Sequence, residues 1–562
     1  MSSNHERFDR PTRRQFFQVA GGAAGALLGG SAAFAHHHGK PTPQSLPYLD
    51  QRMYFHNMEL IAHVPPSKPG TGRGAGQMMA IGGQRLLFSS GDVIDVSDPR
   101  NPTIISRGGA VGGDLVYNAQ LKKWIVMQSS QVPYFAAEFP GGKYDDPTIV
   151  DQFRKWEGLR GIRLHDASDP TKIVELGEFS TGQTGSGPHG DASWYDGGKY
   201  AYLDVAPDDT YTGMLDNLVP LANSLMVVDV SDPGNIKEVS RWHVPGQRAG
   251  MPGETQELKK WKCLQGRGAE MIPDRPLTME EATKIFRNLR YPAFDRFPYT
   301  MSHGASWVPK KVEDGGRYGY GSWSAFGMLV HDFSDITKPS LAGRFDPAPT
   351  FGLDGIPFHT VWLPTLDRGF VVGISEALNP DCNESWLPCW VIDVRDPKNP
   401  VPISMLPRPK APSDAPFTDF CYRRGRFSAH RPADNKAPGR ASQTFLPLEY
   451  FNAGLRCYDL SEPTAPTEVA WFVPPMGGTL SEACRTDEGY NPANPDAEEC
   501  WRESLSYNRP CNSVQVEWDR KILYAGTTTG LYILSTPALG KPILEAIPVV
   551  EWSMPGLNVG AP

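Results

Sequence analysis

One short phrase recurs along most of this 562-residue chain and limits its fold more than any other feature. The phrase consists of an apolar run, an aspartate and a Ser-Asp-Pro-like turn, and a second strand-like run follows it. A short apolar run bounded by turn residues is typical of a strand buried on both faces, and Asp and Pro are typical of the turn that follows. Seven copies are present, the last of them degenerate: residues 93–99, 164–170, 227–233, 330–335, 391–397, 457–463 and 531–537.

The repeat resembles that of the LVIVD-repeat family of β-propellers, and the resemblance covers nearly all of the chain after residue 35. The fold class expected is therefore all-β, a seven-bladed β-propeller of LVIVD-type repeats with four strands in each blade. The aspartate of each copy is expected to cap its turn. Residues 58–65 have the pattern of an outer strand and would close the ring by pairing with the last blade, although residues 542–546 could take the same place.

Two segments interrupt the repeat. The gap between Asp229 and Asp332 is the longest, and inside it Thr278-Met279-Glu280-Glu281 begins a capping box that residues 282–289 continue with helical periodicity. We therefore expect a helical insertion or lid over residues 247–298, between blades 3 and 4. A second, Cys-containing insertion is expected over residues 477–510, and the propeller itself over residues 51–562, after a flexible segment at residues 36–50.

The first 35 residues have the pattern of an export signal. Residues 11–17 (PTRRQFF) precede a weakly apolar Gly/Ala-rich run, and residues 33–35 (AFA) form a small-x-small cleavage site. This stretch resembles a twin-arginine (Tat) signal peptide, which implies the Tat export machinery as a partner and a periplasmic or secreted protein; an uncleaved membrane anchor is the alternative. Cleavage after Ala35 would leave residues 36–38 (HHH) at the new N-terminus, either as a copper ligand or as a disordered tail.

Composition excludes several classes of function. The formal charge is −8 and no long basic run occurs, so nucleic acid is not an expected partner. No later run is long and apolar enough to predict a membrane span in the mature chain. The 57 glycines and 53 prolines are too many for a helical bundle and agree with a fold rich in turns.

All eight cysteines lie in the second half of the chain, and no C-x-x-C motif occurs. An even number of cysteines in an exported protein favours disulfides. Proximity in sequence suggests three pairs, although the sequence alone leaves the connectivity open: Cys382–Cys389, Cys421–Cys457 and Cys484–Cys500.

Histidine carries the strongest functional signal, because four of the thirteen histidines occupy the same place in the repeat. Each opens the innermost strand of its blade, in blades 3 to 6, so that the four should converge at the mouth of the channel. Imidazole is a common ligand of iron, copper and zinc, which predicts a metal site, with iron or copper preferred. The alternative is a strand-start histidine that bonds to backbone. The four predicted metal ligands are His189, His303, His359 and His430.

The other three blades weaken that alternative. Blade 1 has Gln77 near the equivalent place, blade 2 has Asp114 or Asn118, and blade 7 has Asn512, so the repeat itself does not require histidine.

Three carboxylates lie in loops that should open on the same face as the histidines. Asp208, Glu376 and Glu449 each follow the second strand of a blade. Such groups could orient metal-bound imidazoles or act as catalytic acid and base. The alternative is that they are solvated loop charges.

These features predict an exported, metal-dependent enzyme. The expected activity is an oxidoreductase or oxygenase acting on a small organic substrate, with aromatic compounds among the candidates. Aromatic residues near the histidine strands could wall its pocket: Trp194, Trp307, Phe358 and Trp362. A metal-dependent lyase or hydrolase and a non-catalytic binding propeller remain alternatives. Neither G-x-S-x-G nor H-E-x-x-H occurs, which disfavours a serine hydrolase and a zinc protease.

Overall fold

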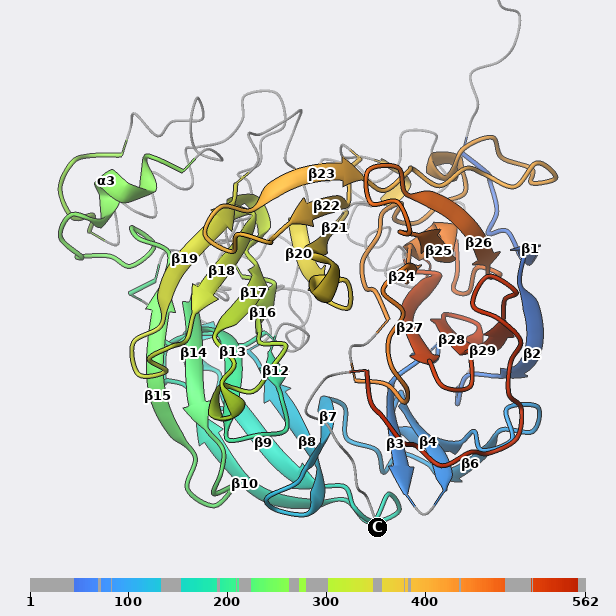
Figure 1. Ribbon diagram of the computed structural model, residues 1–562, viewed down its shortest axis with the longest axis horizontal. Coiled ribbons are helices and arrows are strands. Elements are labelled where there is room, and N and C mark those ends of the chain that lie inside the picture. The colour runs from blue at the N-terminus through green and yellow to red at the C-terminus, as the bar shows by residue number, and fades with distance from the viewer. Residues whose placement is uncertain are drawn as a thin grey trace, which may run out of the picture. The chain divides into compact units, whose positions relative to one another are not determined.

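The computed structural model describes residues 45–553, apart from gaps at 69–71, 82, 133–152, 190–192, 209, 212–223, 262–271, 279–301, 347–355, 379, 383–385, 434–435, 481–506 and 508. Its strands form seven antiparallel sheets that follow one another around a ring (Figure 1). The prediction of an all-β, seven-bladed propeller is confirmed.

Each blade runs from an innermost strand near the axis to an outer strand. Blade 1 contains β3 (Gln77–Ile81), β4 (Gln84–Ser89), β5 (Asp92–Asp95) and β6 (Thr103–Ser106). Blade 2 contains β7 (Asp114–Asn118), β8 (Lys123–Ser130), β9 (Gly161–Asp166) and β10 (Val174–Ser180). Blade 3 contains β11 (Gly187–Pro188) with β12 (Trp194–Tyr195), then β13 (Tyr200–Ala206), β14 (Ser224–Asp229) and β15 (Lys237–His243). Blade 4 contains β16 (Gly304–Trp307), β17 (Tyr318–Ser322), β18 (Met328–Asp332) and β19 (Ser340–Phe345). Blade 5 contains β20 (Ile356–Trp362), β21 (Phe370–Glu376), β22 (Trp390–Asp393) and β23 (Val401–Met405).

The last two blades take strands from both ends of the chain. Blade 6 contains β24 (Phe445–Glu449), β25 (Leu455–Asp459), β26 (Thr467–Val473) and β1 (Tyr54–His56), and blade 7 contains β27 (Cys511–Glu517), β28 (Ile522–Thr527), β29 (Gly530–Ser535) and β2 (Glu59–Val64). In blade 6 the innermost position belongs to the segment after His430, because Pro432 forms a bridge with Leu448 of β24.

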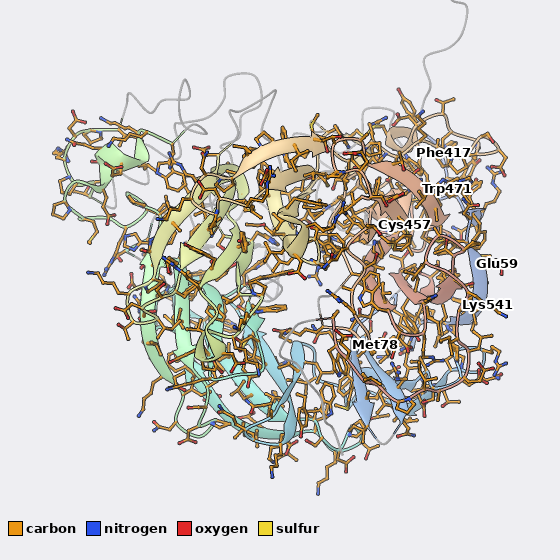
Figure 2. The ribbon with its side chains drawn as sticks, viewed as in Figure 1. Glu59, Met78, Phe417, Cys457, Trp471 and Lys541 are labelled. Atoms are coloured by element: carbon orange, nitrogen blue, oxygen red, sulfur yellow. A yellow bond between two sulfur atoms is a disulfide. The ribbon has the colours of Figure 1, made fainter. Side chains whose placement is uncertain are left out.

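Ring closure follows the first of the two arrangements expected from the sequence. Leu60 of β2 is paired with Leu534 of β29, so a strand from the start of the propeller completes the last blade. Figure 2 labels Glu59 at this outer edge and Met78 on β3, toward the axis. Residues 542–546 form no strand; there the Ile543 amide donates a hydrogen bond to the Arg520 carbonyl at 2.9 Å.

The repeated aspartates cap their turns as predicted. The Asp95 Oδ1 atom accepts a hydrogen bond from the Ser97 amide at 2.9 Å, and Asp459 accepts one from the Ser461 amide at 2.8 Å. The apolar residues before the aspartate are buried, as Val227 and Val228 of β14 illustrate. A strand covered on both sides by neighbouring blades gains from apolar residues at every position, which explains the continuous apolar run in the repeat.

Helices are few and short in the described part of the chain. The α-helix α3 (Glu254–Leu258) begins after Gly253 inside the insertion between blades 3 and 4. The helix predicted from residue 278 onward lies outside the described residues, as do the signal peptide, residues 36–44 and most of the 477–510 insertion. The short 3-10 helices are η5 (Val312–Asp314), η6 (Ser324–Phe326), η7 (Leu366–Arg368), η8 (Pro380–Cys382), η9 (Phe420–Tyr422) and η10 (Phe451–Ala453). Among the helices described, none has the length and apolar character to cross a membrane.

The described part of the segment expected to be flexible, residues 45–50, packs against blade 6. Leu46 is buried. Its amide donates to the Tyr422 carbonyl at 2.8 Å, and its carbonyl accepts from the Arg424 Nε atom at 2.8 Å. Residues 45–50, which precede the expected boundary at residue 51, are therefore packed rather than free in solution.

The disulfide of the described chain joins Cys382 to Cys421. The predicted pairs Cys382–Cys389 and Cys421–Cys457 are therefore wrong, and Cys484 and Cys500 lie outside the described residues. Cys389 and Cys457 are buried free thiols. They point into the blades, and burial raises the pKa of the Cys389 thiol to about 11. Proximity in sequence did not predict the pairing, because segments that are neighbours in the sequence of a propeller lie in different strands and their side chains need not meet.

Breaking this disulfide should destabilise the propeller. Its partners are 39 residues apart in sequence, and closing a loop of that length stabilises the folded state by about 4 kcal/mol through the entropy of the unfolded chain. We expect the double variant Cys382→Ser/Cys421→Ser to lose free energy of unfolding by up to about that amount. Chemical denaturation with and without a reductant measures it. Reductant should weaken the wild-type protein more than the double variant; equal effects on both would contradict the assignment.

Candidate functional site

The four predicted metal-binding histidines lie at equivalent places on neighbouring blades. The amides of three of them donate hydrogen bonds to the second strand of their own blade: His189 to the Asp204 carbonyl, His303 to the Ser322 carbonyl and His430 to the Glu449 carbonyl, at 2.8, 2.9 and 3.1 Å. His359 lies within β20. This shared backbone register brings the four imidazoles to one level around the axis.

The imidazoles form a continuous arc. The Nε2 atoms of His189 and His303 are 3.0 Å apart. The ring centroids of His303 and His359 are 4.2 Å apart, and those of His359 and His430 are 4.4 Å apart. His303, His359 and His430 are buried and His189 is half-buried. The convergence expected from the repeat is therefore present.

Glu376 lies against three of these histidines. It is the last residue of β21, and its side chain is 2% exposed. Its Oε2 atom is 3.6 Å from the Nε2 atom of His359 and 4.0 Å from that of His303. Its Oε1 atom is 3.8 Å from the Nε2 atom of His430. A carboxylate expected in a loop is thus held at the end of a buried strand, facing the imidazoles.

Two arginines that the sequence did not indicate contact the same carboxylate. The Oε1 atom of Glu376 is 2.8 Å from a terminal nitrogen of Arg426 and 3.5 Å from one of Arg509. Neither arginine belongs to a repeated position, so no pattern in the sequence marks it. Both hold Glu376 in its ionised form.

Glu449 and Gln131 orient the two histidines at the ends of the arc. The Oε2 atom of Glu449 is 2.7 Å from the Nδ1 atom of His430, and the Oε1 atom of Gln131 is 2.8 Å from the Nδ1 atom of His189. Because both oxygens accept hydrogen bonds, each Nδ1 atom carries the proton. The Nε2 lone pairs then face the interior of the arc, which is the arrangement that supports metal-ligating histidines.

Asp208 is not brought into this cluster. Its Oδ1 atom accepts a hydrogen bond from the Thr210 amide at 3.0 Å, and its Oδ2 atom is 3.8 Å from a terminal nitrogen of Arg241 on β15. It lies two residues beyond the end of β13 and is partly exposed. Its contacts therefore run toward the outer part of blade 3.

The surroundings give the cluster the protonation states that a metal needs. Burial lowers the pKa of His303 to about 4, and burial together with His303 and His430 lowers the pKa of His359 well below its ordinary value. Burial alone would raise the pKa of Glu376, but His430, Arg509 and Arg426 together hold it at about 2. At neutral pH, His303 and His359 are therefore neutral and Glu376 is ionised, as metal binding requires.

The donor atoms are close enough to share one ion. The ligand atoms of His303, His359 and Glu376 all lie within 4.8 Å of one another, and all three residues are buried. Neither ring nitrogen of His359 has a hydrogen-bond partner among the described residues, and neither has the Nδ1 atom of His303. Buried polar atoms are normally satisfied. A bound cation would satisfy one nitrogen of His359, so the residues fit a transition metal held by two histidines and one carboxylate.

A cavity of about 300 Å³ adjoins the cluster along the axis. His303 and His359 form part of its wall, and Trp194 and Trp307 line it, as expected from the sequence. Phe358 and Trp362 do not: both are fully buried in the packing of the blades.

Fold and site together define the class of the protein: a seven-bladed β-propeller with a buried cluster of histidine and glutamate at its axis. Residues 220–244, which include β14 and β15, match the LVIVD repeat. The sequence matches no curated protein. Among solved structures, the crystal structure of Raptor from Chaetomium thermophilum is similar, with a TM-score of 0.40 and 8% identity; the match covers 87% of this chain and 30% of that chain.

Proposed function

We propose that this protein is an exported metal-dependent oxidoreductase or oxygenase that acts on a small organic substrate at the axial cluster. The observation that carries the proposal is the group of three buried donors, His303, His359 and Glu376, with ligand atoms within 4.8 Å of one another. Two histidines and one carboxylate that leave open positions are the donor set of non-haem iron oxygenases. Iron is therefore the preferred metal, and copper the second.

Different residues of the cluster have different proposed roles. His303, His359 and Glu376 would hold the metal, and His430 and His189, oriented by Glu449 and Gln131, stand beside it as further ligands. When bound, such a metal supplies positions at which dioxygen and a substrate can meet. Arg426 and Arg509 keep Glu376 ionised. Asp208, whose contacts run to Thr210 and Arg241, has no role in this proposal.

Metal-dependent consumption of dioxygen tests the activity. Protein loaded anaerobically with iron(II) should consume dioxygen in the presence of a small aromatic compound, whereas metal-free protein should not. A metal-dependent lyase or hydrolase would transform its substrate without consuming dioxygen, and a non-catalytic binding propeller would transform nothing. Turnover without dioxygen uptake, or no turnover of any substrate, would contradict the oxidoreductase.

The N-terminal 35 residues are proposed to export the protein through the Tat pathway. We expect the double substitution Arg13→Lys/Arg14→Lys to block export, because the paired arginines are the feature by which such a signal is recognised. Cell fractionation and N-terminal sequencing measure the result. The exported wild-type protein should begin at His36. Unchanged export of the lysine variant, or a mature protein that retains residues 1–35, would contradict the assignment.

A further inference from the structure

The disulfide joins the two segments of chain that carry Glu376 and His430. Glu376 is the last residue of β21, and Cys382 follows it in the short helix η8. Cys421 lies in η9 and precedes His430 along the chain. The Cys382–Cys421 bond therefore connects the segment that follows the carboxylate of the cluster to the segment that precedes one of its imidazoles.

Hydrogen bonds extend this connection from the disulfide toward the axis. The Asp381 amide donates to the Gly425 carbonyl at 2.9 Å, and the Asp381 Oδ2 atom accepts from a terminal nitrogen of Arg424 at 3.1 Å. Nearer the cluster, the Ala377 amide donates to the Ser428 Oγ atom at 2.6 Å. The two segments are thus bonded to each other at several successive points.

The last of these connections acts on the cluster itself. A terminal nitrogen of Arg426 is 2.8 Å from the Glu376 Oε1 atom, and the same oxygen is 3.8 Å from the His430 Nε2 atom. We call the two segments, with the bonds between them, the clamp: residues 376–378, 380–382 and 421–430. Since Glu376 and His430 both belong to the clamp, their relative position depends on how firmly it is held.

No sheet ladder joins the two halves of the clamp. The strand β21 ends at Glu376, and residues 421–430 contain no strand. The disulfide is therefore the covalent tie between two irregular segments that the side-chain and backbone bonds alone must otherwise hold. A cross-link of this kind fixes a loop in one arrangement and strengthens binding by preorganising the ligand-binding groups.

The disulfide lies where a small thiol can reach it. Cys382 and Cys421 are both partly exposed, unlike the buried free thiols. A terminal nitrogen of Arg408, which also pairs with Asp419 at 2.6 Å, is 3.6 Å from the Cys421 Sγ atom. A neighbouring cation favours the thiolate form of a cysteine, and the thiolate is the species that leaves and returns in thiol–disulfide exchange.

We propose that the Cys382–Cys421 disulfide is a redox switch for the axial cluster. Its formation holds Glu376 against His430 and raises the affinity for the metal; its reduction releases the clamp and lowers that affinity. This inference rests on the proposed function, since it concerns the regulation of the same metal site.

The chemistry of the switch is exchange with a dithiol. In reduction the S–S bond of the protein breaks and two S–H bonds form, while the dithiol gives up two electrons and two protons and closes into its own disulfide. Oxidation by a disulfide reverses each step. Because disulfides persist in oxidising compartments and are reduced in the cytosol, the chain would hold its metal weakly before export and firmly after it.

The affinity of the oxidised and the reduced wild-type protein for iron(II) tests the switch. Dithiothreitol reduces the protein anaerobically and is removed by gel filtration, and competition with a chromophoric chelator then measures the affinity. We expect reduction to lower it about 10-fold, because loss of a group that orients metal ligands typically costs 10–100-fold. Re-oxidation with oxidised glutathione should restore it. Circular dichroism confirms that the samples are folded.

Two variants separate the switch from other effects of reductant and from loss of stability. Cys382→Ser/Cys421→Ser should have the affinity of the reduced protein and respond to dithiothreitol much less than wild type. Ile533→Ala removes a buried side chain from β29 in blade 7 and is the control for destabilisation, so it should keep the wild-type affinity. Undiminished affinity in the reduced wild type, or an equal loss in oxidised Ile533→Ala, would overturn the switch.

Failure of the proposed function has a different signature. An oxidised wild-type protein that binds no iron would refute the metal site. Hydrogen–deuterium exchange of the metal-free protein then decides the clamp. Faster exchange after reduction in peptides that contain Ala377 and His430 supports it, because their amides are bonded to Ser428 and Glu449. Unchanged exchange in these peptides overturns it.

Discussion

His359→Ala should lower the affinity of the protein for iron(II) by more than about 100-fold. Loss of a residue that merely orients a ligand typically costs 10–100-fold, so loss of a ligand should cost more. His359 is the centre of the arc: its ring lies 4.2 Å from that of His303 and 4.4 Å from that of His430. Both of its nitrogens lack a hydrogen-bond partner among the described residues. Competition with a chromophoric chelator measures the affinity.

The control is His165→Ala in blade 2. His165 is also a buried histidine on a strand, and its Nε2 atom is 3.2 Å from the Gln128 Oε1 atom. The substitution His165→Ala also removes a buried imidazole but does not touch the cluster, so the protein should keep its affinity for iron. Loss of iron in both variants would show that destabilisation alone is the cause. Full affinity in folded His359→Ala would remove His359 from the site.

Glu376→Gln should have an effect of similar size, although it preserves the shape of the side chain. The substitution removes the one carboxylate within 4.0 Å of the Nε2 atoms of His303 and His359 in the described structure. It also leaves Arg426 and Arg509 facing a neutral amide, which adds repulsion toward a bound cation. We expect the affinity for iron(II) to fall by about 100-fold or more, with the fold intact by circular dichroism.

Asp208→Asn is the matched control for this carboxylate. Asp208 lies just beyond the second strand of blade 3, and Glu376 is the last residue of the second strand of blade 5, but the contacts of Asp208 are with Thr210 and Arg241. Iron binding should be unchanged. If Asp208→Asn weakened binding as much as Glu376→Gln, the loss would report the general acidity of this face rather than a ligand.

The repeat made the fold and the histidines predictable because it marks equivalent positions on successive blades. The Asp-capped turn and the outer strand β2 follow from local patterns, and both are present as expected. The four histidines could be grouped without any knowledge of distances, because equal places in a ring repeat lie at equal distances from its axis. Blades 1, 2 and 7 have other residues at the equivalent place, which indicated that the repeat itself does not require histidine there.

What the sequence left open depends on register and on contacts between blades. Glu376 and Asp208 looked alike, but Glu376 is paired with Ile356 at the end of β21 whereas Asp208 lies beyond the end of β13. That difference of two residues decides which carboxylate reaches the axis. Likewise the Cys382–Cys421 disulfide and the Arg426–Glu376 ion pair join segments that no repeated pattern relates.

Elemental analysis of the exported, folded protein tests the central claim most directly. The wild-type protein, purified without added metal or chelator, should contain stoichiometric iron, or copper as the second candidate, and the double variant His303→Ala/His359→Ala should contain almost none. Circular dichroism confirms that both samples are folded. Stoichiometric metal in the wild type that disappears in the double variant is the predicted result. A folded wild-type protein that contains no transition metal, and takes up none from solution, would contradict the account.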